Sequence, residues 1–103
     1  MKHSQTIGQE LLEAAHQLSP KLVEWRRHLH ANPELSFKEY KTQAYVMDQL
    51  RAVGLSPKPI ADTGVIVTLG PTASETCIAV RADMDALPIT EIGGRSYGSI
   101  NQG

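Results

Sequence analysis

Apolar residues recur at helical spacing through the first third of the chain. In residues 7–18, and again in residues 20–31, they gather on one face of a helix. Ser19 and Pro20 lie between the two stretches, in the order of a helix N-cap and a first helical residue. The pattern therefore predicts two successive helices, the second of which ends before Pro33, because the residue before a proline avoids helical geometry.

A third helix is predicted for residues 37–53. Its apolar stripe follows Ser36 and Glu39, which have the spacing of a capping box. Gly54 follows the last apolar residue of the stripe, and glycine is the common residue at the left-handed position that ends a helix. We therefore expect this helix to begin at the capping box and to end at Gly54.

After the third helix the pattern changes from helical to extended. Residues 55–60 contain two prolines, so we expect an edge strand or an extended connector there. Residues 62–64 have the composition of a turn. β-Branched and apolar residues at 65–69 and at 76–82 predict two strands, and the short loop between them favours an antiparallel hairpin. Helices followed by strands of one sheet place the chain in the α/β fold class.

Two aspartates end the apolar run of the last predicted strand. Asp83 and Asp85 lie directly after it and before Pro88. Carboxylates in the loop after a strand can bind a hard cation or orient a group that does. Aspartate and proline are also ordinary turn residues, and the spacing alone favours that plainer interpretation. The pair is also smaller than a catalytic zinc site, which usually has three protein ligands.

Composition narrows the class of protein. The chain has 103 residues, of which 41% are hydrophobic and 20% charged, as in a globular domain or part of one. Its net charge of -1 gives no electrostatic footprint for nucleic acid or an anionic membrane. A single cysteine excludes an internal disulfide, and the first residues carry no secretory signal. We therefore expect a cytoplasmic protein that spans no membrane.

The remaining candidates for chemistry each have a plainer structural interpretation. His28 and His30 are two residues apart, so they face different directions on a helix and suit its C-terminus rather than a shared metal. Cys77 is expected to be a small buried apolar residue. Glu34 could cap a neighbouring helix or reach a substrate, and Glu91 is expected to be a solvated charge.

Two stretches together resemble a known family. Residues 25–39, followed by residues 81–91, are similar to the amidohydrolase branch of the co-catalytic metallopeptidases. That branch includes hippurate hydrolases and N-acyl-amino-acid amidohydrolases. Thr42 and the turn at 62–64 also match the expected pattern. The resemblance implies a zinc-peptidase-like catalytic domain, in which helices are followed by the strands of a mixed sheet.

The resemblance also implies a reaction. Two divalent metals, zinc, manganese or similar, would activate a water, with a glutamate as general base, to cleave the amide bond of a small N-acyl amino acid. Asp85 occupies the position of the aspartate that supports the metal centre. Asp83 stands where other branches place a metal-binding histidine. The ligand motif His-x-Cys-Gly-His-Asp would follow Gly103, so no metal ligand is assigned to a residue of this chain.

Two interpretations of the chain follow from the resemblance. In the first, residues 1–103 are the N-terminal part of the catalytic domain, with an incomplete sheet and no dimerisation domain. Such a chain would bind metal weakly or not at all and would be inactive alone. In the second, the chain is a non-catalytic remnant or a partner-binding module, and its unfinished sheet favours self-association.

Overall fold

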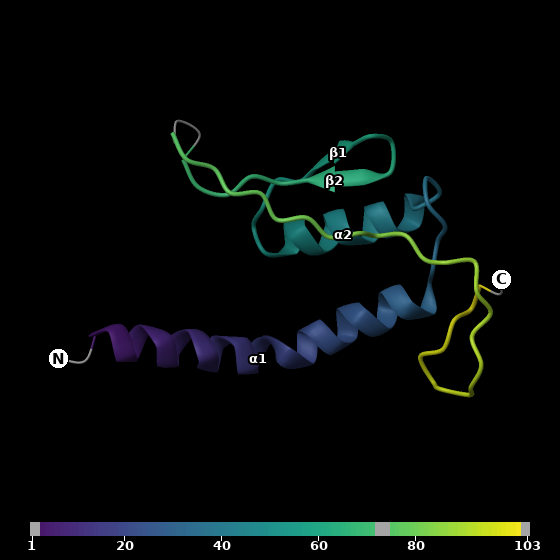
Figure 1. Cartoon of the computed structure of the whole chain (residues 1–103), viewed down its shortest axis with the longest axis horizontal. Coiled ribbons are helices and arrows are strands. Elements are labelled where there is room, and N and C mark those ends of the chain that lie inside the picture. The colour runs from purple at the N-terminus through teal and green to yellow at the C-terminus, as the bar shows by residue number, and fades with distance from the viewer. Residues whose placement is uncertain (1–2, 72–74, 102–103) are drawn as a thin grey trace.

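The computed structural model describes residues 3–71 and 75–101. Two helices, α1 (His3–Ala31) and α2 (Tyr40–Ala52), are followed by two short strands, β1 (Lys58–Ile60) and β2 (Gly64–Ile66), and then by an extended segment (Figure 1). The predicted α/β class is therefore confirmed. Within the described part of the chain, no helix combines the length and the apolar character that a membrane span requires.

The predicted break at Ser19 and Pro20 is wrong, because α1 is one continuous helix with Pro20 inside it. Leu18 and Leu22 lie four residues apart, so the apolar stripe continues in phase across the proline. A proline inside a helix removes one backbone hydrogen bond and bends the helix. Figure 1 accordingly shows a change in direction about halfway along α1.

The start of α2 differs from the predicted capping box. Phe37 has a positive φ of 65°, which interrupts the helix that Ser36 was expected to cap. The N-cap is instead Glu39, whose side chain makes no capping hydrogen bond. It accepts a hydrogen bond of 2.9 Å from Thr63 Oγ1, so it holds the turn between the strands rather than the helix end.

The C-terminus of α2 forms as predicted. Gly54 has a φ of 88°, in the left-handed region. Its N–H donates to the carbonyl of Arg51 at 3.0 Å, and the N–H of Leu55 donates to the carbonyl of Leu50 at 3.1 Å. These are the two hydrogen bonds of a Schellman motif, which satisfies carbonyls that the helix itself leaves unpaired.

The sheet is an antiparallel hairpin of β1 and β2. Lys58 pairs with Ile66 and Ile60 with Gly64. Two consecutive residues of the connecting loop, Ala61 and Asp62, have positive φ, as tight hairpin turns often require. The hairpin is tied to α2 by Gln43, whose Nε2 donates to two backbone carbonyls of the turn region at 2.8 and 2.9 Å.

The predicted hairpin of residues 65–69 with residues 76–82 is wrong. The first of these stretches contributes only to β2, which pairs with β1, and the second forms no strand. Ile78 and Val80 are 85% and 94% exposed. An apolar strand gains stability mainly from packing between covering layers, and no described residue covers these two side chains.

Little of the described structure is core. Met47 is the one large hydrophobic side chain buried among the described residues. The accessible surface is 8701 Å², whereas a compact protein of 11.3 kDa exposes about 5,700 Å². The radius of gyration is 17.2 Å, against about 13 Å for a compact domain of this length. The chain therefore leaves a large apolar surface available for packing.

Replacing Gly54 tests the end of α2. Gly54→Ala should lower the free energy of unfolding by about 1–2 kcal/mol, because a side chain at φ 88° is strained even though no atom lies within 4 Å of the added Cβ. The control is Gly8→Ala within α1, which should raise helix stability by up to about 1 kcal/mol. Urea unfolding followed by circular dichroism at 222 nm measures both. A neutral Gly54→Ala would contradict the assignment of the cap.

Candidate functional site

The two predicted aspartates lie on the extended segment near the hairpin turn. Residues 81–85 line a hollow of about 390 Å³ together with Ser36, Phe37, Glu39 and the β1–β2 turn. Asp83 Oδ1 pairs with Arg81 Nη2 at 2.8 Å, but their side chains are 69% and 89% exposed. Exposed pairs of this kind contribute at most about 1 kcal/mol. Asp83 and Asp85 therefore end an uncovered segment rather than a buried strand.

The backbone beside Asp85 is nevertheless fixed. The N–H of Ala86 donates to the carbonyl of Glu34 at 2.7 Å, and Leu35 and Ala86 form an isolated parallel bridge. These contacts place the segment that carries Asp85 against the connection between α1 and α2. The two stretches that carry the family resemblance are thus adjacent in space, although they are distant in sequence.

Glu34 caps α2 from outside the helix. Its Oε1 accepts hydrogen bonds of 2.6 Å from both the N–H and the Oγ1 of Thr42, and its Oε2 accepts one of 3.2 Å from the N–H of Lys41. Thr42 is only 6% exposed. Of the two roles considered for Glu34 from the sequence, the structure supports helix capping.

Opposing effects act on the pKa of Glu34. Desolvation of the carboxyl raises the pKa, whereas the hydrogen bonds from Thr42 and Lys41 lower it, and the net result is a pKa below the ordinary value of 4.5. The ionised carboxylate is therefore favoured by the folded structure, as expected for an anion at a helix N-terminus.

The aspartates are not assembled into a metal centre. Among the residues that the structure describes, no group of three or more histidine, cysteine, aspartate or glutamate side chains is close enough to hold a metal ion. Two exposed carboxylates on one loop are fewer ligands than a stable two-metal site requires. The described residues by themselves therefore do not fit a pair of divalent cations.

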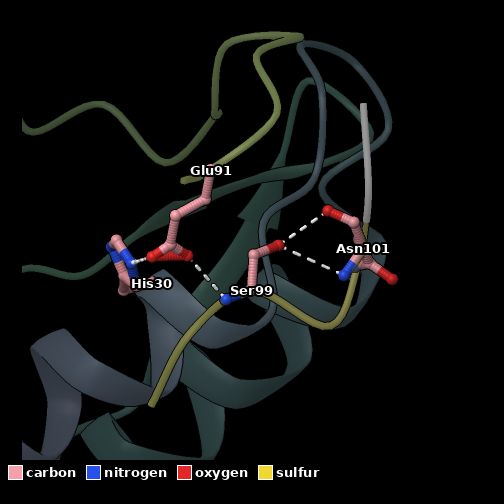
Figure 2. A network of polar contacts seen from close by, with 4 residues as sticks. All are labelled: His30, Glu91, Ser99 and Asn101. Carbon is pink, nitrogen blue, oxygen red and sulfur yellow. Dashed lines mark hydrogen bonds and ion pairs between the residues drawn. The ribbon is translucent and has the colours of Figure 1, made fainter. Parts of the chain in front are cut away.

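A second polar cluster lies at the C-terminal end of α1. Figure 2 shows the carboxylate of Glu91 between His30 and Ser99. Glu91 Oε2 lies 2.8 Å from His30 Nε2, and Glu91 Oε1 accepts a hydrogen bond of 2.8 Å from the N–H of Ser99. The side chain of Glu91 is only 20% exposed. The prediction that Glu91 is a solvated charge is therefore wrong, and no local spacing could reveal a partner 61 residues away.

The two histidines lie in the last turn of α1, as predicted, and face different partners. The ring of His28 stacks on that of Tyr45 in α2, with centroids 3.7 Å apart and planes 10° from parallel. His30 contacts Glu91 instead. The structure therefore gives no shared ligand position to the pair.

Cys77 is exposed, which contradicts the prediction of a small buried residue. The prediction depended on a covered strand at residues 76–82, and this segment is exposed.

The sequence relatives match most of this chain, but each match covers only a small part of the relative's own length. No family model matches it. A putative glutamate–cysteine ligase of Rhodococcus jostii is 51% identical over 77% of this chain, but the match spans 10% of that protein, so its name is weak evidence for the matched segment. N-acetyldiaminopimelate deacetylase of Halalkalibacterium halodurans is 41% identical over 84% of this chain and 24% of its own length.

Two solved structures have the same arrangement of elements. A dinuclear metal-binding peptidase of the M20 family from Bacillus subtilis matches with a TM-score of 0.77 and 33% identity, over 85% of this chain and 25% of its own. A putative aminohydrolase from Staphylococcus aureus matches with a TM-score of 0.83 and 38% identity, over 92% of this chain and 26% of its own. The chain therefore spans about a quarter of the length of most of these proteins.

Removing the carboxylate of Glu34 tests the cap of α2. Glu34→Ala should lower the free energy of unfolding by about 1–2 kcal/mol at pH 7. Because the folded pKa lies below 4.5, this stability is present above pH 4.5 and is lost as the pH falls through the folded value. Urea unfolding at pH 7 and pH 3 should therefore show a smaller difference at pH 3. Glu13→Ala, at an exposed position of α1, is the control, and an equal effect of Glu34→Ala at both pH values would contradict the role of the charge.

Proposed function

Because this chain is homologous to the N-acyl-amino-acid amidohydrolases and M20-family metallopeptidases, over about a quarter of their length, we propose that it forms part of the scaffold of a metal-dependent amidohydrolase. The observation that supports this most directly is the contact between Glu34 and Ala86, which joins the two stretches that resemble the family. Under this proposal, residues 1–103 belong to the catalytic domain and not to a dimerisation domain.

The proposed reaction is hydrolysis of the amide of a small N-acyl amino acid. The oxygen of water bonds to the acyl carbon, the C–N bond breaks, and a proton from the water passes to the leaving nitrogen, so the products are a carboxylic acid and a free amino acid. The names of two relatives, an N-acetyldiaminopimelate deacetylase and an N-acetyl-L-cysteine deacetylase, support this substrate class. A cytoplasmic location remains a prediction from the single cysteine.

We assign metal coordination to the longer relatives and to none of the described residues of this chain. One related structure is described as a dinuclear metal-binding peptidase, which supports two metals in the family. Among the described residues of this chain no such ligand set exists, so we derive no catalytic step from them. We propose Asp85 as a residue that supports the metal site, and Asp83 as a weaker candidate because it pairs with Arg81.

The surface of the chain favours a second candidate function, that of a partner-binding module. Val80 is 94% exposed, and the accessible surface exceeds that of a compact protein of this mass by about half.

Sedimentation velocity over a range of concentrations tests whether the partner is a second copy of this chain. We expect the average molecular mass of the sedimenting species to increase with protein concentration. A chain that stays monomeric at every concentration would contradict self-association.

Complementation tests the main proposal. The chain alone, with Zn²⁺ or Mn²⁺, should release no amino acid from N-acetylated substrates. Mixed with the rest of the Halalkalibacterium halodurans deacetylase, expressed separately, it should restore hydrolysis. Asp85→Asn should lower the restored rate about 10–100-fold, as for residues that orient metal ligands.

The matched control for complementation is Asp48→Asn, an exposed aspartate of α2 that pairs with Arg51. It should leave the restored rate unchanged. Hydrolysis by the chain alone would contradict the main proposal, and equal loss in both variants would contradict the proposed role of Asp85.

A further inference from the structure

The last described segment is held against the end of α1 without forming a helix or strand. The N–H of Ile100 donates to the carbonyl of Ala31 at 2.9 Å, and Asn101 Nδ2 donates to the carbonyl of Pro33 at 3.0 Å. The guanidinium of Arg27 lies 4.2 Å from the centre of the Tyr97 ring, within the range of a cation–π contact. Residues 91–101 therefore fold back onto the helix that begins the chain.

Glu91 uses one carboxylate oxygen to join this segment to α1 and the other to hold the segment to itself. One oxygen contacts His30 of α1 and the other accepts the N–H of Ser99, each at 2.8 Å (Figure 2). Hydrogen bonds that involve an ionised partner are shorter and stronger than neutral ones. Because a single carboxylate makes both contacts, loss of its charge weakens them together.

The same carboxylate lies at one end of the short stretch that directly follows Asp85. Residues 86–91 are anchored at one end by the hydrogen bond from Ala86 to Glu34, and at the other end by Glu91. Between these anchors, Leu87 and Ile89 line a cavity of about 390 Å³ under the end of α1. A short stretch fixed at both ends cannot shift unless one anchor breaks.

We propose that Glu91 is a positioning residue, which closes residues 91–101 over the end of α1 and thereby holds the Asp85 segment in place. The consequence for Asp85 rests on the proposed amidohydrolase function, whereas the closure itself does not. We call the contacts of Glu91 with His30 and Ser99 the Glu91 clasp.

The charges around the clasp make it sensitive to acid. His30 and Arg27 face it from α1, and Arg95 and Tyr97 from the segment itself. The pKa of Glu91 lies below its ordinary value of 4.5. The largest cause is the hydrogen bond with His30, and the second is the hydrogen bond from the Ser99 N–H. The contribution of the clasp is therefore present above pH 4.5 and is lost as the pH falls through the lower, folded pKa.

Nuclear magnetic resonance of the whole chain tests the clasp. In the unmodified protein, the amide signal of Ser99 should shift between pH 7 and pH 2 with a midpoint below 4.5. Glu91→Gln should abolish this transition, and the control Glu13→Gln should retain it. No transition at Ser99 in the unmodified protein, or the same transition in Glu91→Gln, would overturn the proposal.

Amide hydrogen exchange tests the positioning of the Asp85 segment. At pH 7, Glu91→Gln should increase the exchange rates of the Ala86 and Ile100 amides by about tenfold, while the Leu55 amide at the end of α2 stays unchanged. Faster exchange at Ile100 alone would overturn the positioning role. Neither measurement depends on catalysis, so failure of the complementation assay and failure of the clasp are separate results.

Discussion

The arrangement of the chain depends on one residue at the junction of its two helices. The carboxylate of Glu34 accepts the first N–H groups of α2, and the backbone carbonyl of the same residue accepts the N–H of Ala86. The first contact sets where α2 begins, and the second sets where the Asp85 segment lies. Because both contacts come from one residue, the orientation of α2 and the position of the candidate site are coupled. The capped helix end is also a local electrostatic constraint, since its positive dipole favours the ionised form of Glu34.

Signals that act over a few residues predicted part of the structure and failed at the helix break of Ser19 and Pro20. The helical stripes, the glycine that ends α2 and the turn after β1 all follow from residues close together in sequence. Contacts between distant residues could not be predicted in this way. The Glu91 clasp joins residues 61 positions apart. The capping box failed because Glu34, eight residues before Thr42, supplies a better placed acceptor than Ser36. The buried strand at 76–82 was inferred from composition, and composition does not supply the layers that bury a strand.

The candidate site has a hydrogen-bonded backbone support, but the described residues do not include a group of ligands that could hold a metal ion. The apolar run that ends at Asp83 and Asp85 makes them candidates, the family resemblance gives them roles, and the structure places their segment beside the α1–α2 connection. Spacing alone favoured an ordinary turn, and the exposed pairing of Asp83 with Arg81 agrees with that plainer interpretation for Asp83. What distinguishes Asp85 is its fixed backbone neighbour, Ala86. Asp83 and Asp85 belong to the same exposed loop, so the difference between them is that Asp85 lies next to a backbone group held by a hydrogen bond.

The exposed apolar run that ends at Val80 has a consequence for the newly synthesised chain. Ile78 and Val80 present β-branched side chains to water on an extended backbone, which is the form that aggregating segments share. Arg81 and Asp83 follow the run directly and act as charged gatekeepers against stacking of identical segments. Burial of Ile78 and Val80 in a folded structure therefore competes with their association with other copies of the chain. The outcome depends on which of these two events happens first. The order of these events during synthesis therefore affects how much of the chain reaches its folded state.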